Sequence, residues 1–315
     1  MKAAVVRRYG PPEVAVVEDL PEPNIKPNEL LVRIEAVAVT AGDARIRAAR
    51  FPSGFGLPAR LALGLRGPRT SVLGSAFSGV VVRVGSAASG FSPGDEIAGM
   101  NGVKMGAHAQ LAAIRTTSIA LKPAGVSHVD AAGAIFGGTT ARQFLHERVR
   151  AGSKVLVNGA SGAVGSSAVQ LAALAGAEVT AVTSAANASL ASRLGAAHVV
   201  DYRQRPLADL PHDFDLVFDA VGNVDRGLGS RLAGADGLAV LAVASLWDTV
   251  RPGGRVLTGP IQESAGDVAH LLGLLETGRL DPVTESLGGL DAIVDAYRLI
   301  DSGRKVGNVV LQPWL

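Results

Sequence analysis

The hydrophobic and polar positions follow one pattern in the first third of the chain and another in most of the rest. Up to residue 122, short apolar stretches rich in β-branched residues, such as Leu30–Val39 and Val80–Val84, alternate with turns that contain glycine and proline. This pattern predicts β-strands joined by short turns. From about Ala124, short apolar segments alternate with helical ones, which predicts a parallel sheet with right-handed crossovers.

The individual elements can be placed from the same pattern. In the alternating part we expect a helical region over 130–149 interrupted by Gly137-Gly138, strands over 154–158, 178–182, 198–200, 214–220 and 255–258, and helices over 163–175 and 186–194. The tail predicts a helix over 290–302, a glycine turn and a strand over 308–312. Residues 50–69 are rich in Gly and Pro and predict a long loop, which either covers a site or packs on the body of the protein.

Composition narrows the class of protein. The 315 residues are enough for two domains, and 48% hydrophobic against 18% charged residues predicts a large core. The net charge is +2, and even the densest basic stretch, Arg60–Arg69, is interrupted by apolar residues, so we expect no nucleic-acid partner. No apolar run is long enough for a membrane span, and the first residues look like a strand, so we expect a cytoplasmic protein with no membrane partner.

The strongest functional signal lies in Lys154–Gly165, where an apolar strand leads into a glycine-rich turn and then into an uncharged helix. Glycines let backbone N–H groups approach a pyrophosphate, and the start of a helix adds partial positive charge. The strict G-x-G-x-x-G pattern is altered, because Ala160 takes the place of its first glycine, before Gly162 and Gly165. A tight turn alone also favours glycine, but the surrounding strand and helix predict a dinucleotide site.

Several further segments appear in an order and spacing typical of one family. They are Lys2–Val14, Val39–Asp43, Leu73–Ser75 with Gly79–Val81, Phe91–Glu96, Phe136–Ala141, Phe218–Gly222, Pro252–Arg255 and Gly307–Val310. Together with the glycine turn, they resemble the medium-chain dehydrogenase/reductase superfamily in its zinc-independent quinone oxidoreductase branch. The resemblance implies an α/β fold, in which a doubly wound Rossmann sheet accompanies a GroES-like, β-rich barrel that binds the substrate.

The resemblance also implies a division of the chain. We expect a substrate domain over 1–123, completed by 282–315, with a Rossmann dinucleotide-binding domain over 124–281 and the active site in the cleft between them. A catalytic zinc of the alcohol-dehydrogenase type needs cysteine ligands, and the chain has no cysteine. Its six histidines show no ligand spacing either, so no zinc or other metal is expected.

The end of the second Rossmann strand indicates which dinucleotide binds. NAD enzymes place an acidic residue there to accept hydrogen bonds from the ribose, whereas this strand is followed by Thr183-Ser184. The missing carboxylate favours NADPH over NADH. The family often has a basic residue near Ala186 and a tyrosine that matches Tyr202, so the alanine weakens this preference.

Position and resemblance together give the candidate site residues. Thr140 is expected to open the helix before the glycine turn and to reach the nicotinamide, with a plain helix cap as the alternative. The other cofactor-binding candidates are Ala160, Ser161, Gly162, Ala163, Val164, Thr183, Ser184, Asn187, Tyr202, Val221, Gly222, Thr258, Gly259 and Asn308.

The substrate half offers fewer candidates. Thr40 takes the place of a family asparagine, and its hydroxyl could donate a hydrogen bond to a substrate carbonyl. Asp43 follows on the same predicted loop, where an ion pair with Arg45 would be a purely structural alternative. His108 is interpreted as a packing residue, with proton delivery as the alternative.

These observations predict an enzyme that transfers a hydride from NADPH to a quinone or another activated carbonyl or alkene. Two alternatives stay open: an enoyl, alkenal or carbonyl reductase of the alcohol-dehydrogenase kind, and an NADPH-binding redox sensor without turnover. A homodimer is possible, but only residues 259–266 separate the last predicted Rossmann strand from the next helix. We therefore expect an altered interface, in which the apolar stretch Leu238–Trp247 makes a different contact or packs inside its own subunit.

Overall fold

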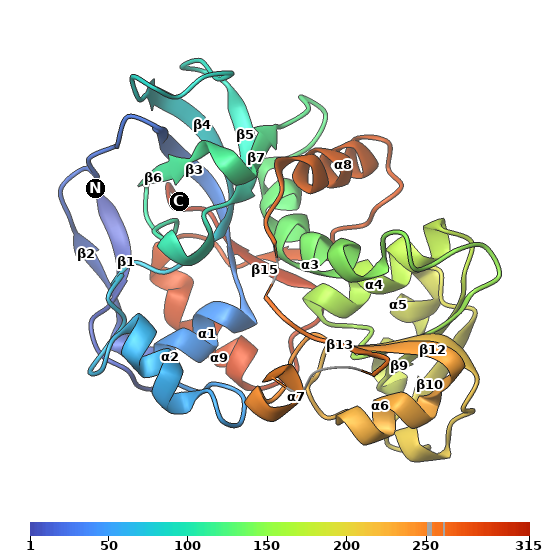
Figure 1. Ribbon diagram of the computed structural model, residues 1–315. Helices are drawn as coiled ribbons and strands as arrows, with labels where there is room; N and C mark the ends of the chain where they lie inside the picture. Colours follow the sequence, from blue (N-terminus) through green and yellow to red (C-terminus); the bar gives the residue numbers. More distant parts are fainter. Residues whose placement is uncertain (251–253, 261) are drawn as a thin grey trace. The chain divides into compact units, whose positions relative to one another are not determined.

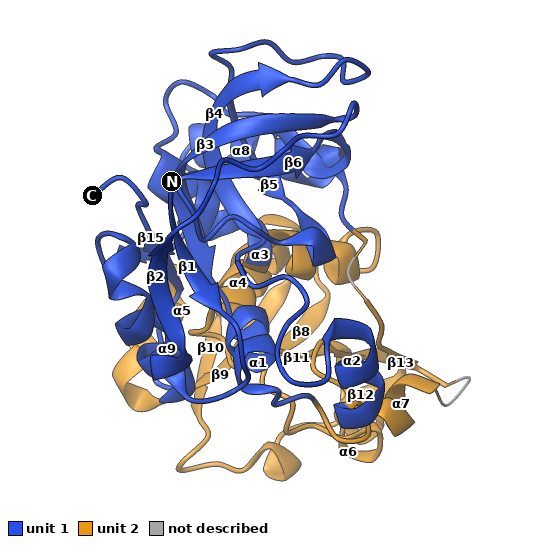
Figure 2. Cartoon of the chain, turned by 90° about the vertical axis from the view of Figure 1, so that its left-hand side faces the viewer, with its two compact units in different colours: residues 1–51, 56–136, 263–315 blue, residues 52–55, 137–262 orange. Residues whose placement is uncertain are grey.

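The computed structural model describes residues 1–250, 254–260 and 262–315. These residues form two compact units, of which the first comprises 1–51, 56–136 and 263–315 and the second comprises 52–55 and 137–262 (Figure 2). Relative to the predicted domains, residues 124–136 and 263–281 are grouped with the first unit. The domain limits of 1–123 with 282–315, and of 124–281, stay a prediction.

The first unit is built on a seven-stranded sheet of order β14-β15-β3-β4-β5-β7, with β6 paired to β3 off this path (Figure 1). Its strands are β3 (Glu29–Val39), β4 (Ala76–Val84), β5 (Glu96–Met100), β6 (Leu111–Arg115), β7 (Ile119–Leu121), β14 (Thr284–Ser286) and β15 (Asn308–Leu311), beside a separate pair of β1 (Lys2–Val6) and β2 (Ala15–Asp19). The C-terminal β15 runs antiparallel to β3, with Val309 opposite Val39. The end of the chain therefore completes a sheet that begins near the N-terminus.

Helices and an apolar core complete this unit. The helices are α1 (Ala41–Ala48), α2 (Gly56–Leu63), α8 (Ala265–Glu276), α9 (Ile293–Asp301) and the first half of α3 (His128–Leu145). Many residues of the strands, among them Leu30, Ile34, Phe77 and Ile97, are fully buried. Tyr297 of α9 joins the same core. Burial of this apolar surface is the dominant stabilising contribution.

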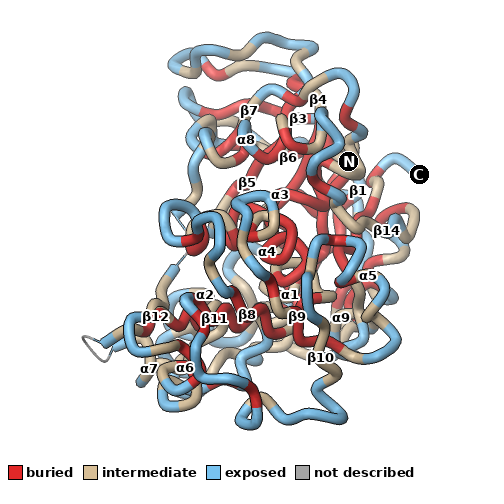
Figure 3. Tube along the Cα trace, turned by 90° about the vertical axis from the view of Figure 1, so that its right-hand side faces the viewer, coloured by how far each residue is buried: buried red, intermediate tan, exposed pale blue. Residues whose placement is uncertain are grey.

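The second unit is a doubly wound parallel sheet of order β10-β9-β8-β11-β12-β13. Its strands are β8 (Lys154–Asn158), β9 (Glu178–Thr183), β10 (His198–Asp201), β11 (Phe214–Asp219), β12 (Ala233–Leu241) and β13 (Val256–Leu257); its helices are the second half of α3, α4 (Ala163–Leu174), α5 (Ala188–Arg193), α6 (Arg226–Leu232) and α7 (Leu246–Val250). The central strands β8 and β11 are buried along most of their length (Figure 3). The predicted Rossmann sheet is confirmed.

Several element predictions are wrong. Residues 50–69 are not a continuous loop, because the apolar stretch Gly56–Leu63 forms α2. The helical region ends at Leu145, and Gly137-Gly138 do not interrupt it. Any side chain at Gly137 would collide with the carbonyl oxygen of Ala163, so this glycine allows α3 to pack closely on the start of α4.

The predicted helix over 186–194 divides into a 3-10 turn at 185–187 and α5. The predicted strand at 255–258 shortens to β13, and the Pro252-Gly253 turn before it lies outside the described residues. The stretch 238–247 has two parts: Ala239–Leu241 are buried within β12, between β11 and β13, whereas Trp247 of α7 is 69% exposed. None of the helices in the described chain is long and apolar enough to cross a membrane.

Candidate functional site

The glycine turn joins β8 to α4 and leaves backbone donors unused. Gly162 is the N-cap of α4 with an extended backbone, and no side chain caps the helix there. The first hydrogen bond of the helix runs from the N–H of Ser166 to the carbonyl oxygen of Gly162, over 2.8 Å. By helix geometry, the preceding N–H groups, on Ala163, Val164 and Gly165, have no intrahelical acceptor. These three donors at the positive end of the helix form a site suited to a phosphate group.

The two glycines of the turn have different roles. A Cβ at Gly165 would collide with the carbonyl oxygen of Gly159, so this glycine allows the helix to pack tightly on the turn. A Cβ at Gly162 would meet only the same oxygen, at 3.5 Å, an ordinary contact. The space in front of Gly162 is therefore left open by the chain, whereas Gly165 is needed for folding.

Three of the predicted cofactor residues meet at one hydroxyl group. Thr183 Oγ1, at the end of β9, donates to Ser161 Oγ over 3.0 Å, and Asn187 Nδ2 donates to the same oxygen over 3.1 Å. Ala160 is fully buried beneath them, and its N–H donates to the carbonyl oxygen of Val182. The turn, the end of the second strand and the following helix are thus fixed to one another.

The end of β10 adds a cation that the sequence reasoning missed. Tyr202 is half exposed, and its N–H donates to the carbonyl oxygen of Thr183 over 3.2 Å. The guanidinium of Arg203 lies 5.7 Å from the centre of the Tyr202 ring. Asp201 accepts the N–H of Arg203 over 3.0 Å and holds this turn, which is a structural role. Arg203 thus places a positive charge beside Tyr202, and the basic residue after this tyrosine was the available signal in the sequence.

A buried carboxylate holds the next candidate loop. Asp219, at the end of β11, accepts hydrogen bonds from the N–H groups of Val221, Gly222 and Val224 at 3.0–3.2 Å. Asn158 Nδ2, at the end of β8, also donates to it over 2.8 Å. Val221 and Gly222 thus lie just beyond the carboxyl end of β11. Asp219 and Asn158 were not predicted, although each is a polar residue at the end of an apolar strand.

The remaining candidates of the second unit lie on separate elements, after β13 and within α3. Thr258 and Gly259 follow β13, and Gly259 has a left-handed backbone with φ of +135°. Thr140 does not open a helix, since it lies buried inside α3. It follows the close contact at Gly137 by one helical turn, which places it on the face of α3 that meets the start of α4.

In the first unit, Thr40 and Asp43 form a capping box at the start of α1. The Asp43 carboxylate accepts from the backbone N–H of Thr40 at 2.8 Å and from its hydroxyl at 2.6 Å, and the N–H of Gly74 donates to its other oxygen over 3.0 Å. The alternative of an Asp43–Arg45 ion pair on a loop is wrong, because the segment is a helix and the Asp43 carboxylate binds these three donors instead. The hydroxyl hydrogen of Thr40 is directed at Asp43.

Asn308 and His108 lie close to this capping box in the fold. The register of β15 against β3 places Asn308 opposite Thr40, and its side-chain amide donates to the carbonyl oxygen of Pro282 over 2.7 Å. His108 is buried with Nε2 3.2 Å from the carbonyl oxygen of Ala38, and its ring meets Tyr297 edge-on. Burial lowers the pKa of His108, which favours the neutral ring. These contacts support the packing interpretation.

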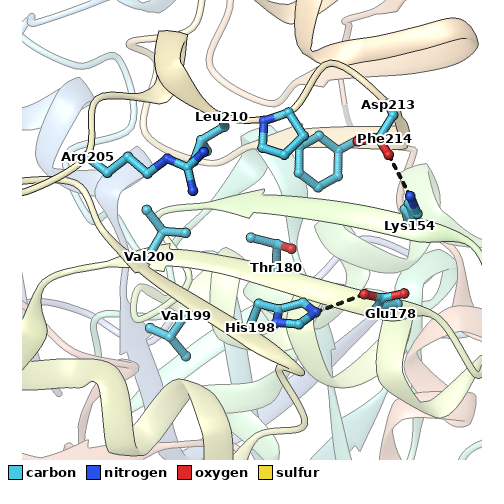
Figure 4. Close-up of a pocket in the computed structure, with 11 residues that line it drawn as sticks. Lys154, Glu178, Thr180, His198, Val199, Val200, Arg205, Leu210, Asp213 and Phe214 are labelled. Atoms are coloured by element: carbon cyan, nitrogen blue, oxygen red, sulfur yellow. Dashed lines mark hydrogen bonds and ion pairs between the residues drawn. The ribbon is translucent and has the colours of Figure 1, made fainter.

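A hollow of about 390 Å³ lies over the opposite, amino-terminal edge of the parallel sheet (Figure 4). Four of its charged side chains form two pairs, Lys154 with Asp213 at 2.5 Å and His198 with Glu178 at 2.8 Å, and the fifth, Arg205, donates to the carbonyl oxygen of Asp209. It contains none of the predicted site residues. Within the described part of the chain, no cluster of three or more His, Asp and Glu side chains could hold a metal ion.

Comparison with known proteins identifies the family. Residues 26–148 match the alcohol dehydrogenase GroES-like domain and residues 194–311 match the zinc-binding dehydrogenase domain. The chain is 31% identical to a 2-methylene-furan-3-one reductase of Solanum lycopersicum and 30% identical to a chloroplastic NADPH-dependent alkenal/one oxidoreductase of Arabidopsis thaliana, covering 99% of this chain and 79% and 80% of those proteins.

Among solved structures, the quinone oxidoreductase from Coxiella burnetii superposes with a TM-score of 0.87 at 25% identity, over 99% of both chains. The predicted combination of a GroES-like domain and a Rossmann sheet is therefore confirmed. The chain belongs to the medium-chain dehydrogenase/reductase superfamily, in its zinc-independent quinone oxidoreductase branch, and is an oxidoreductase.

Proposed function

We propose that this enzyme uses NADPH to reduce carbon–carbon double bonds conjugated to a carbonyl group, with quinones as a second class of acceptor. The observation that carries the proposal is the glycine turn, where three backbone donors of α4 face a space that only Gly162 keeps open. Conjugated alkenes are favoured because relatives about 30% identical are a methylene-furanone reductase and an alkenal/one oxidoreductase.

The residues present fit a dinucleotide. The N–H groups of Ala163 and Val164 would hold the pyrophosphate, and the loop at Val221-Gly222, fixed by Asp219, would line the ribose and nicotinamide crevice. We keep Thr140, Thr258, Gly259 and Asn308 as proposed contacts at the nicotinamide end. When bound, NADPH supplies the hydride that the substrate's double bond accepts.

NADPH is favoured over NADH by the groups near the end of β9. A carboxylate after Thr183 would repel a 2′-phosphate, and this chain has Ser184 instead. The hydroxyl groups of Ser184 and Tyr202 and the guanidinium of Arg203 are donors suited to phosphate oxygens. We propose that these three side chains select the phosphorylated cofactor.

Thr40 and Asp43 have a positioning role in this proposal. Because the Thr40 hydroxyl donates to Asp43, it would have to break a charge-assisted hydrogen bond of 2.6 Å before it could polarise a substrate oxygen. The pair instead fixes the start of α1 against Gly74. With both groups occupied, solvent supplies the proton that the reduced substrate takes up. We propose no zinc or other metal in the reaction.

The experiment is NADPH oxidation measured against matched acceptors: a conjugated enone, its saturated ketone, and a quinone. We expect turnover with the enone and the quinone and none with the saturated ketone. Preference for the saturated ketone would identify a carbonyl reductase. Tight NADPH binding without turnover of any acceptor would identify the redox sensor, and either result would overturn the proposal.

A further inference from the structure

Arg45 of α1 is a partly buried cation without a partner. Its guanidinium makes no hydrogen bond or ion pair with any residue in 1–250, 254–260 or 262–315, and burial lowers its pKa. Arg47, two residues later, is fully buried but pairs with Asp301 at 2.5 Å and donates to the carbonyl oxygen of Gly10 at 2.6 Å. Of the two arginines on this short helix, Arg47 therefore has partners for its charge and Arg45 has none in the described ranges.

No carboxylate in the described ranges forms an ion pair with Arg45. The Asp43 carboxylate already accepts three hydrogen bonds from Thr40 and Gly74. The residues outside the described ranges are Arg251, Pro252, Gly253 and Ile261, and none of them is acidic. A charge removed from water without a partner is costly, so an anion from outside the chain would be strongly favoured beside this group.

The helix places this cation near the candidate substrate residues. Side chains of an α-helix lean toward its N-terminus, so the stem of Arg45 leans toward Ala41, one turn earlier, and toward the end of α1 that Thr40 caps. Ala41 and Gly42 have little or no side chain, so the first turn itself adds no large group next to the stem of Arg45. A guanidinium presents a planar pair of donors that matches both oxygens of a carboxylate.

We propose that Arg45 binds a carboxylate on the substrate, so that the preferred acceptors are conjugated enones or quinones that carry a carboxylate group. This inference rests on the proposed reduction of conjugated double bonds and names the substrate class for it. Arg45 acts here as a specificity-determining residue, whereas the hydride acceptor is the conjugated double bond of the same molecule.

The test compares benzylideneacetone that carries a para-carboxylate with its methyl ester, each titrated into the protein–NADP⁺ complex by calorimetry. We expect the acid to bind at least about 10-fold more tightly than the ester, the range of a charge-assisted hydrogen bond. Arg45→Met should abolish this difference, and Arg45→Lys should retain part of it. The matched control is Arg83→Met, which removes an exposed arginine of β4 that pairs with Glu22.

Turnover separates this inference from the proposed function. Unsubstituted benzylideneacetone tests reduction of the double bond alone, and its failure as a substrate would count against the function while the acid–ester comparison still decides the role of Arg45. Equal binding of acid and ester by the wild type would overturn the inference, even if no Arg45 variant folds. An equal loss of kcat for both compounds in Arg45→Met would also overturn it, because the guanidinium would then act on the reacting carbonyl oxygen.

Discussion

Replacing Gly162 with valine should separate cofactor binding from folding. The backbone of Gly162 is extended, with φ of −81° and ψ of 173°, which valine adopts without strain. A Cβ there meets one oxygen at 3.5 Å, so the folded chain has room for the new side chain. The remaining cost is the poorer N-cap, about 1 kcal/mol against a total stability of about 5–15 kcal/mol. The variant should therefore fold.

The loss of NADPH binding should be much larger. The valine side chain would occupy the space through which a pyrophosphate reaches the N–H groups of Ala163, Val164 and Gly165. A hydrogen bond to a charged group contributes about 1.5–3 kcal/mol, so losing two of them weakens binding by about 3–6 kcal/mol. This corresponds to a Kd for NADPH that rises by about 100-fold or more.

Gly165→Ala is the matched control, because its Cβ would collide with the carbonyl oxygen of Gly159. We expect it to lower the free energy of unfolding by about 1–3 kcal/mol or more, as overpacking does. Urea denaturation and calorimetric titration with NADPH measure both quantities for both variants. A folded Gly162→Val protein with wild-type affinity would show that the phosphates are not held at this turn. A loss of more than about 3 kcal/mol of stability in Gly162→Val would contradict the open space inferred there.

Three further outcomes are expected. Arg203→Ala should raise the Kd for NADPH about 10-fold and leave that for NADH unchanged, and equal changes would exclude a contact with the 2′-phosphate. Burial lowers the pKa of Lys305 from 10.5 to about 8. Between about pH 8 and pH 10.5 the unfolded chain therefore binds more protons than the folded chain, so the free energy of unfolding of the wild type rises with pH over this range. Lys305→Met should therefore raise the free energy of unfolding at pH 7. Urea denaturation measures this increase over the wild type, and an increase that is as large at pH 10 as at pH 7 would refute the argument. For assembly, burial of Ala239–Leu241 in β12 favours packing of this stretch inside its own subunit, and a dimer in solution with one continuous sheet across two copies would contradict an altered interface.

Periodicity predicted the second unit well because each of its strands is a short apolar run that ends at a polar residue or a turn. β8, β9 and β11 were predicted to within one residue at each end, since Lys154, Glu178 and Phe214 mark clear starts. The prediction failed where tertiary contacts override local preference. Gly137-Gly138 favour a break in a helix, but close packing of α3 on α4 requires a glycine at 137 and the helix continues.

The site was predictable where a residue type has one dominant role and less so where side chains converge from distant segments. The glycine turn and Thr183 follow directly from the strand–turn–helix order, and the structure adds that Ser161 joins Thr183 to Asn187. Arg203 and Arg45 were not predicted as site residues, since nothing in the sequence shows that one guanidinium lies over Tyr202 or that the other has no acidic partner. The partners of a side chain come from distant segments of the chain, and the hydrophobic periodicity of the sequence carries no information about them.

The two buried carboxylates near the candidate site and the donors beside them are used differently by the fold. The buried carboxylates of Asp43 and Asp219 each accept several hydrogen bonds, most of them from the backbone, so neither is available as a base for the reaction. The donors at the start of α4 and the guanidinium of Arg45 have no such partners in the described chain. Asp43 and Asp219 thus hold loops while these donors stay open, an arrangement suited to bind anions and to leave the chemistry to the cofactor. Hydride transfer to a conjugated double bond needs orientation and charge stabilisation more than a nucleophile, so the reaction proposed here is compatible with carboxylates that are occupied in holding loops.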